Sequence, residues 1–205
     1  MKQYALLDGI RSPSDVQALR EDELPALCEE IRSFLIDTVK KTGGHLASNL
    51  GVVELTVVLH RVFSLPEDRI VFDVGHQAYT HKLLTGRKGG FERLRQIGGI
   101  SGFPRPTESP YDAFVAGHAS TSISAALGIA EAALLQKRTD YTVAVIGDGA
   151  LTGGEAYEAL NNAGRSRTRL IIILNHNDMS ISKNVGAFAK YLAVLRSKPG
   201  YLRMK

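Results

Sequence analysis

Residues 142–149 read TVAVIGDG, an apolar run that ends in an aspartate between two glycines, and this stretch decides the fold class. A short apolar run of this kind is typical of a buried parallel strand. Residues 69–75 (RIVFDVG) and 170–178 (LIIILNHND) have the same form, and helix-forming stretches at 121–137 and 153–164 alternate with the runs. The alternation predicts a doubly wound α/β domain, with a mainly parallel sheet and flanking helices.

The first third of the chain has a helical period instead. Apolar residues recur at spacings of three and four from about Glu23 to Lys41, and Gly43-Gly44 supplies a stop. A second helix is expected to begin with Ser48 or Asn49 as its N-cap and to end near Phe63.

Residues 84–114 are rich in glycine and proline and follow neither a helical nor a strand period. The sequence predicts a long loop region here, with little regular structure. Loops of this length inside a compact domain are uncommon and usually serve as functional segments or lids.

Composition favours one globular domain. The chain has 205 residues, 44% of them apolar and 22% charged, with a net charge of +4. No run approaches the roughly 20 apolar residues of a membrane span, and the start lacks a secretory signal, so a cytoplasmic protein is expected. No basic stripe interleaved with aromatic residues suggests nucleic-acid binding. Cys28, the single cysteine, forms no internal disulfide and is expected to be a buried structural thiol.

Polar residues follow two of the predicted strands, at the sheet edge where open parallel sheets bind ligands. Gly147-Asp148-Gly149 ends one strand and Asn175-His176-Asn177 ends the next, with room for one helix between them. A carboxylate and an amide oxygen suit a magnesium ion that takes its other ligands from a diphosphate and water. The Gly-Asp-Gly turn alone occurs in many folds, but its pairing with the later motif resembles the motif of thiamin-diphosphate-binding enzymes.

Several long motifs, in one order, extend this likeness over nearly the whole chain. They resemble the 1-deoxy-D-xylulose-5-phosphate synthase family, a transketolase-like group of transferases. The matching segments are GGHLASNLGVVELTVVLH (43–60), DVGHQAYTHKLLTGR (73–87), GHASTSISAALG (117–128), GDGALTGGEAYEALNNAG (147–164) and LNHNDMSIS (174–182).

The resemblance implies a set of cofactor and metal contacts. Magnesium would be held by Asp148, by Asn177, which also counts among the cofactor contacts, and by the backbone carbonyl of Met179. The other contacts to thiamin diphosphate would come from His76, Gly117, His118, Ala119, Gly149 and Ala150.

The resemblance also implies that His45 faces the reacting carbons beside the cofactor. His45 and His76 each follow a glycine, which permits close approach of the backbone to a ligand. Imidazole is suited to proton exchange near neutral pH. His60 and His81 are interpreted as ordinary structural histidines.

Three residues depart from the usual family pattern. Ala119 stands where serine is common, His176 where aspartate is common, and Glu155 where methionine is usual. We expect them to tune the pocket without loss of metal binding, although a carboxylate at Glu155 would repel a diphosphate unless it is screened.

Members of the resembled family join pyruvate to D-glyceraldehyde 3-phosphate, and release carbon dioxide and 1-deoxy-D-xylulose 5-phosphate, a precursor of isoprenoids, thiamin and pyridoxal. The resemblance implies that residues 1–205 form the diphosphate- and magnesium-binding N-terminal domain, incomplete at its C-terminal end. The pyrimidine-binding domain, with its activating glutamate, and the C-terminal domain would be absent. The chain alone is then expected to be inactive, and the full-length enzyme to be a homodimer.

Three alternatives stay open at this point. The chain could be one subunit of a split transketolase-like enzyme, or a non-catalytic module that binds diphosphate and magnesium. A dehydrogenase with a dinucleotide-binding domain is disfavoured, because no G-x-G-x-x-G follows a strand.

Overall fold

A computed structural model describes residues 3–176 together with residues 194 and 198. Its centre is a sheet of three parallel strands, in the order β1-β2-β3. The strands are β1 (Arg69–Phe72), β2 (Thr142–Gly147) and β3 (Leu170–Asn175). In the register, Val71 pairs with Ala144, which pairs with Ile172. The three strands and their parallel pairing confirm the sequence prediction.

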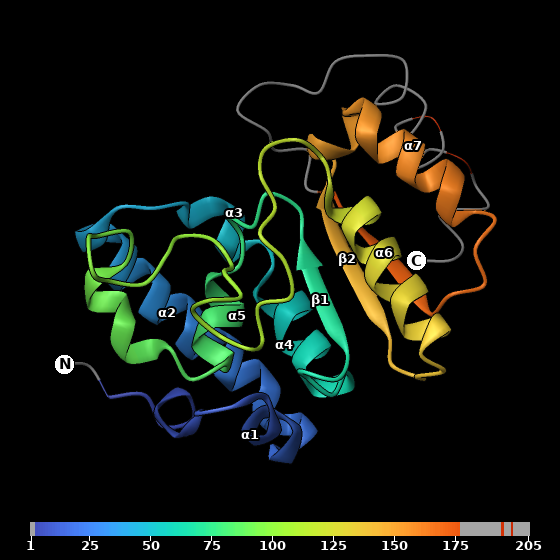
Figure 1. Ribbon diagram of the computed structural model, residues 1–205. Coiled ribbons are helices and arrows are strands. Elements are labelled where there is room, and N and C mark those ends of the chain that lie inside the picture. The colour runs from blue at the N-terminus through green and yellow to red at the C-terminus, as the bar shows by residue number, and fades with distance from the viewer. Residues whose placement is uncertain (1–2, 177–193, 195–197, 199–205) are drawn as a thin grey trace.

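Helices cover both faces of this sheet, as Figure 1 shows. Side chains alternate between the faces along each strand, so each face has its own core. Helices α6 (Ser122–Leu135) and α7 (Gly154–Ala163) pack on the face that holds Val71, Ala144 and Ile146. Helix α4 (Val53–Val62) supplies Leu59 to the opposite core, whose strand residues are Ile70, Phe72, Val143 and Val145. The doubly wound arrangement is therefore confirmed.

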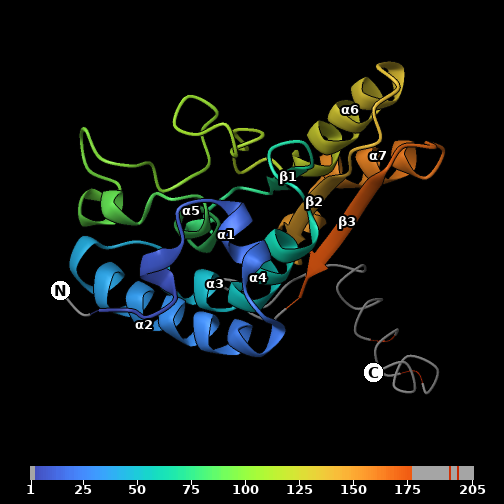
Figure 2. The same cartoon turned by 90° about the horizontal axis from the view of Figure 1, so that it is seen from below.

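A helical layer lies beyond α4 and encloses a third core, visible from below in Figure 2. Its elements are α1 (Pro13–Ala18), α2 (Leu24–Thr42), α3 (Leu46–Leu50) and α5 (Tyr79–Leu84). Cys28 lies in this core with 5% of its surface exposed, and burial raises the pKa of the thiol to about 11. The expectation of a buried structural thiol is confirmed, because a thiol with so high a pKa is a poor nucleophile near neutral pH.

The prediction of a second helix that begins at Ser48 or Asn49 is wrong about where the helix begins. Two helices, α3 and α4, stand there, separated at Gly51 and Val52. Asn49 lies inside α3 and caps nothing, because tertiary contacts occupy its amide: Nδ2 donates to the carbonyls of His45 (2.6 Å) and His76 (2.8 Å), and Oδ1 accepts from the Tyr79 amide (2.8 Å).

The long loop is confirmed. Residues 85–121, all of them described, contain one regular element, the 3-10 helix η3 (Lys88–Arg93). The other 3-10 turns of the described residues are η1 (Leu7–Gly9), η2 (Glu21–Glu23) and η4 (Ala150–Thr152). No helix in the described part of the chain combines the length and apolarity that a membrane span requires.

Candidate functional site

The carboxylate of Asp148 lies where β2 ends, and only 7% of the residue is exposed. Its backbone N–H donates to the carbonyl of Asn175 (3.1 Å), and its Oδ1 accepts from the Gly149 amide (2.9 Å). Its Oδ2 lies 2.5 Å from Nδ1 of His176. The structure thus brings the two strand-end motifs together. The other two residues expected to hold a metal, Asn177 and Met179, lie outside the described residues.

One carboxylate at this edge fits a particular kind of metal site. Among residues 3–176, 194 and 198 there is no group of three or more histidine, cysteine or acidic side chains that could enclose an ion. Magnesium does not require such a group when phosphate oxygens and water complete its shell. Two oxygens with four lone-pair positions leave Asp148 able to bind a cation while it accepts from Gly149 and His176.

Three of the histidines selected from the sequence lie close together, and two of them contact the ring of Phe103. The rings of His45 and His76 are 5.4 Å apart between centroids, in an edge-to-face arrangement. The ring of Phe103 lies 6.1 Å from that of His45 and 6.3 Å from that of His118. These residues come from the start of α3, the turn after β1, the long loop and the segment before α6. We call His45, His76 and His118 the histidine triad.

The surroundings of His45 and His76 favour neutral imidazoles. Burial lowers the pKa of His45, and the charges of Arg95 and His118 lower it further. Burial also lowers the pKa of His76, with His45 and His118 acting in the same direction and Asp73 against them. Nδ1 of His45 and Nδ1 of His76 are buried without a partner in the described part of the chain. Each ring therefore keeps one nitrogen for a ligand or a water molecule.

The loop that carries His118 packs against the turn that follows Asp148. Ser120 Oγ donates to the carbonyl of Ala150 (2.6 Å), and a Cβ on Gly153 would stand 2.3 Å from Ser120 Oγ. The exposed segment 117–119 is therefore held beside Gly149 and Ala150. A Cβ built on Gly117 would meet nothing within 4 Å, so the space beside this segment is open.

Several buried polar atoms near the end of β1 were not anticipated from the sequence. Asp73, the residue after β1, accepts from the Ser122 amide through Oδ2 (3.1 Å), while its Oδ1 is unpartnered in the described residues. The same is true of Gln77 Oε1, Thr80 Oγ1 and Ser122 Oγ. Buried polar atoms without protein partners usually bind water or a ligand. The position of Asp73 directly after a strand was the signal that could have revealed it.

The carboxylate of Glu155, which was expected to repel a diphosphate, is hydrogen-bonded within the protein. Its Oε1 accepts a hydrogen bond from Ser124 Oγ at 2.6 Å, and Ser124 belongs to α6. The carboxylate is thus tied to a neighbouring helix, which offsets part of the cost of a negative charge near a bound anion.

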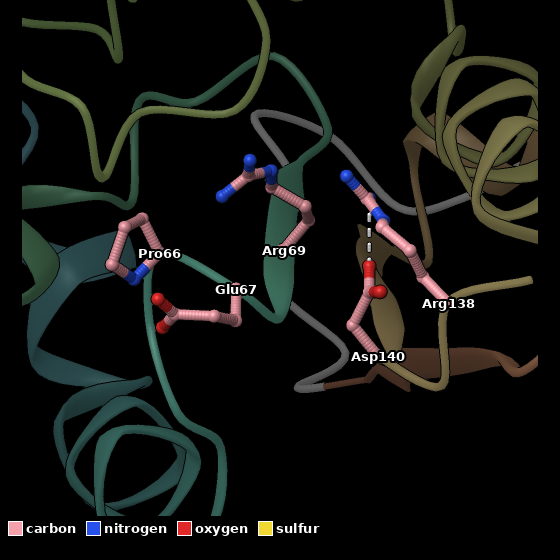
Figure 3. Close-up of a pocket in the computed structure, with 5 residues that line it drawn as sticks. All are labelled: Pro66, Glu67, Arg69, Arg138 and Asp140. Carbon is pink, nitrogen blue, oxygen red and sulfur yellow. Dashed lines mark hydrogen bonds and ion pairs between the residues drawn. The ribbon is translucent and has the colours of Figure 1, made fainter. Parts of the chain in front are cut away.

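A small hollow of about 180 Å³ lies at the opposite end of β1 (Figure 3). It is lined by Pro66, Glu67, Arg69, Arg138 and Asp140, and Arg138 pairs with Asp140 at 2.8 Å. Two acids balance the two arginines, so the hollow has no net charge to attract a phosphate. Arg69 is the first residue of β1, whereas the triad lies beyond the last. The candidate site is therefore at the other edge of the sheet.

Comparison with known proteins agrees with this geometry. The family model described as 1-deoxy-D-xylulose-5-phosphate synthase matches residues 7–205. The chain belongs to the 1-deoxy-D-xylulose-5-phosphate synthase family. It is similar to the synthase of Thiobacillus denitrificans, with 63% identity over 193 residues, covering 94% of this chain and 31% of the relative. The synthases of Caldanaerobacter subterraneus and Clostridium acetobutylicum are each 58% identical to it, over 98% of this chain and 32% and 33% of their own lengths.

The chain spans about a third of the length of these curated relatives. Membership of the synthase family removes the dinucleotide-binding dehydrogenase from consideration. The other two alternatives, a split enzyme and a non-catalytic module, stay open because they concern what accompanies this third of the synthase.

Proposed function

We propose that this chain supplies the diphosphate- and magnesium-binding part of an enzyme that joins pyruvate to D-glyceraldehyde 3-phosphate, releasing carbon dioxide and 1-deoxy-D-xylulose 5-phosphate. The product would feed isoprenoid, thiamin and pyridoxal synthesis. The observation that carries the proposal is the convergence of the histidine triad beside the turn that begins with Asp148. The similarity to relatives named 1-deoxy-D-xylulose-5-phosphate synthase supports the reaction.

The metal would be held by Asp148, Asn177 and the carbonyl of Met179. The fit rests on Asp148, which presents a nearly buried carboxylate at the carboxyl edge of the sheet. Gly149, Ala150 and the segment 117–119 would surround the diphosphate. The open space beside Gly117 supports this placement, because backbone N–H groups of a glycine turn can approach phosphate oxygens closely.

His76 would bind the cofactor and His45 would face the substrate carbons. When bound, thiamin diphosphate supplies the electron sink that decarboxylation of a 2-keto acid requires. His45 would hold or move a proton at its unpartnered Nδ1, which a neutral imidazole can do in either direction. Phe103 would exclude water from this nitrogen, since its ring lies 6.1 Å from that of His45.

The proposal extends to the setting of the full-length enzyme. We propose a cytoplasmic homodimer whose partners are its small-molecule substrates, with no membrane or nucleic acid among them. These statements rest on the resemblance to the synthase family.

The metal assignment is tested by titration calorimetry on the chain with thiamin diphosphate and magnesium. Asp148→Ala should abolish magnesium-dependent binding, because the carboxylate is the only acidic ligand proposed for the metal. Asp140→Ala is the matched control, since Asp140 lies at the opposite end of the sheet. Unchanged cofactor affinity in Asp148→Ala would refute the assignment.

Turnover is tested in a full-length chimera, in which this chain replaces the matching segment of the Thiobacillus denitrificans synthase. The chimera should release carbon dioxide from pyruvate only when glyceraldehyde 3-phosphate, thiamin diphosphate and magnesium are present. A folded chimera that binds the cofactor but converts no pyruvate would contradict the proposed reaction.

A further inference from the structure

Six polar side chains form a buried group outside the histidine triad. Two are cationic, two are carboxylates and two are imidazoles, and we call them the buried ionic cluster. Its members are His60 on α4, His81 and Lys82 on α5, Arg87 after α5, and Glu108 and Asp112 in the long loop. The side chains of Lys82 and Asp112 have no exposed surface, and His60 has none either.

The two cations hold the two carboxylates of the loop. Arg87 binds Asp112 with both terminal nitrogens, Nη1 to Oδ2 at 2.7 Å and Nη2 to Oδ1 at 2.8 Å. Nη1 of Arg87 also reaches Glu108 Oε1 (2.9 Å), and Lys82 pairs with the same carboxylate. Charges of opposite sign cancel within the cluster. Residues 108–112 are thus fixed to α5 and to the turn that follows it.

The two imidazoles extend the cluster to α4 in a definite protonation pattern. His81 Nε2 lies 3.0 Å from Asp112 Oδ1, and a carboxylate held by Arg87 accepts there, so His81 Nε2 carries the proton. His81 Nδ1 is then the acceptor for His60 Nε2, which lies 2.9 Å away and must donate. Burial lowers the pKa of both rings, which keeps both neutral.

The carboxylates also fold the loop around Phe103. Glu108 Oε2 accepts from the Ser101 amide and Asp112 Oδ2 accepts from the Arg105 amide, each at 2.7 Å. Phe103 lies midway between these two anchored amides. Its neighbour Pro104 presses on the turn before His76, because a Cβ on Gly75 would stand 2.5 Å from Pro104 Cδ.

We propose that Asp112 and Glu108 are positioning residues for the active site, which hold Phe103 against His45 and His118 through the loop they fold. The inference rests on the proposed function, because it assigns Phe103 to the reacting end of that site. No hydrogen bond, ion pair or ring contact joins the cluster directly to the triad among the described residues, so the cluster acts through the loop. A carboxylate in this role is needed in its charged form, since it accepts from two cations and a backbone amide at once.

The structural half is tested on the chain without any cofactor. Hydrogen exchange at the amides of Ser101 and Arg105 should be at least about tenfold faster in Asp112→Asn, which weakens the acceptor of one amide and leaves Arg87 and Lys82 undercompensated. Nuclear Overhauser contacts from the Phe103 ring to His45 and His118 should weaken in the same variant. Thr107→Ala, an exposed position in the same loop, is the control and should change neither.

Glu108→Gln is the milder variant if Asp112→Asn does not fold, because Glu108 is partly exposed whereas the Asp112 side chain is fully buried. It should speed exchange at Ser101 more than at Arg105, since the Ser101 amide is its partner. Unchanged exchange and unchanged ring contacts in the folded variants would overturn the inference.

The functional half is tested in the chimera. Phe103→Leu, which leaves the cluster intact, and Glu108→Gln should each lower kcat at least about tenfold, because small displacements of a reacting group are costly. The dissociation constant for thiamin diphosphate with magnesium should change less than about threefold. Normal kcat in Phe103→Leu, in a chimera whose Asp148→Ala variant has lost cofactor binding, would sink the positioning inference and leave the proposed function standing. Intact cofactor binding in Asp148→Ala would sink the proposed metal site, whatever the exchange experiment shows.

Discussion

The imidazole rings of His45 and His76 meet edge to face, with their centroids 5.4 Å apart, although 30 residues separate the two along the sequence. Asn49 locks the pair, since one amide nitrogen donates to the carbonyls of both residues. Burial lowers the pKa of both rings, and the neighbouring His45 lowers the pKa of His76 further. The pair is therefore suited to a site that needs neutral imidazoles near pH 7.

His45→Ala in the chimera should lower kcat about 100-fold or more, because proton transfer by a positioned side chain contributes roughly 10²–10⁴ to rate. The affinity for thiamin diphosphate should change little, since the diphosphate is held at the Asp148 edge. Steady-state kinetics at saturating cofactor and calorimetry separate the two effects. Weakened cofactor binding with normal turnover at saturation would reverse the assigned role.

Asn49→Ala should separate the two histidines without removing either. The change deletes three buried hydrogen bonds, to His45, His76 and Tyr79, so the free energy of unfolding should fall by about 2–4 kcal/mol. Chemical denaturation measures this loss. Ser48→Ala, one residue earlier, removes only a long hydrogen bond from a half-buried hydroxyl to the His45 carbonyl (3.5 Å) and should cost less than about 1 kcal/mol. Equal losses in the two variants would show that Asn49 does not anchor the pair.

The buried imidazoles predict a definite pH dependence of stability. The pKa values of His60 and His81 are lowered in the folded chain, so below pH about 6.5 the unfolded chain binds protons that the folded chain does not. Stability is then fully present above that pH and falls as the pH drops toward the folded pKa values. The slope is about 1.4 kcal/mol per pH unit for each such group.

Denaturant titrations between pH 7.5 and 5 measure that slope. His60→Gln should reduce it, because one group that must stay neutral has been removed. The carboxylates Glu108 and Asp112, whose pKa values are lowered by Lys82, Arg87 and His81, should add a separate loss only below about pH 4. An identical slope in the parent chain and His60→Gln would contradict the account.

The backbone conformation of Gly86 predicts that a larger residue there destabilises the fold. Its φ is +80°, and a Cβ there would stand 2.2 Å from the carbonyl oxygen of Arg11, so an added methyl group meets rigid backbone. Gly86→Ala should lower the free energy of unfolding by about 2 kcal/mol or more. Gly89→Ala is the matched control three residues on, where a Cβ meets nothing within 4 Å. Equal stability of the two variants would refute the clash.

The sequence was sufficient for the sheet, because three apolar runs of strand length alternated with helical stretches. The three histidines that the structure brings together were also selected from the sequence, His45 and His76 from their preceding glycines and the family motifs, and His118 from the motifs alone. The contributions of Asn49, Asp73 and Phe103 depend on partners far away in the chain, which no local period records. Asn49 was mistaken for a helix cap for this reason: its side chain has the chemistry of a cap, but tertiary partners claim it.

The buried ionic cluster also could not be predicted from local sequence patterns. The glycine and proline content of residues 84–114 predicted a loop, but it did not predict which residues the loop contacts. Only the fold reveals that Glu108 and Asp112 meet Lys82 and Arg87 in the interior. The cost of burying these charges is offset by ion pairs between different elements, which a local sequence pattern does not record. His60 and His81 were interpreted as structural residues, and the structure agrees with this, because both are buried and hydrogen-bonded within the cluster.

The 205-residue chain alone should be catalytically silent. The resemblance places the glutamate that activates the cofactor in a domain outside the third of the synthase that this chain matches. Without a carboxylate at the aminopyrimidine, the proton that must leave the cofactor before pyruvate reacts is lost too slowly for turnover. Cofactor binding should be weak as well, because only the charged diphosphate end gains contacts and that end is already well solvated in water.

The assay follows carbon dioxide from pyruvate with glyceraldehyde 3-phosphate, magnesium and thiamin diphosphate, first with the chain alone and then after addition of the remaining two thirds of the Thiobacillus denitrificans synthase as a separate polypeptide. Activity that appears only on mixing would favour the split-enzyme arrangement over a non-catalytic module. Sustained release by the chain alone, abolished by Asp148→Ala, would mean that it carries its own activating base. In that case the base must be sought among residues 1–205 themselves, and Asp73 at the end of β1, whose Oδ1 has no partner among the described residues, is the first group to replace.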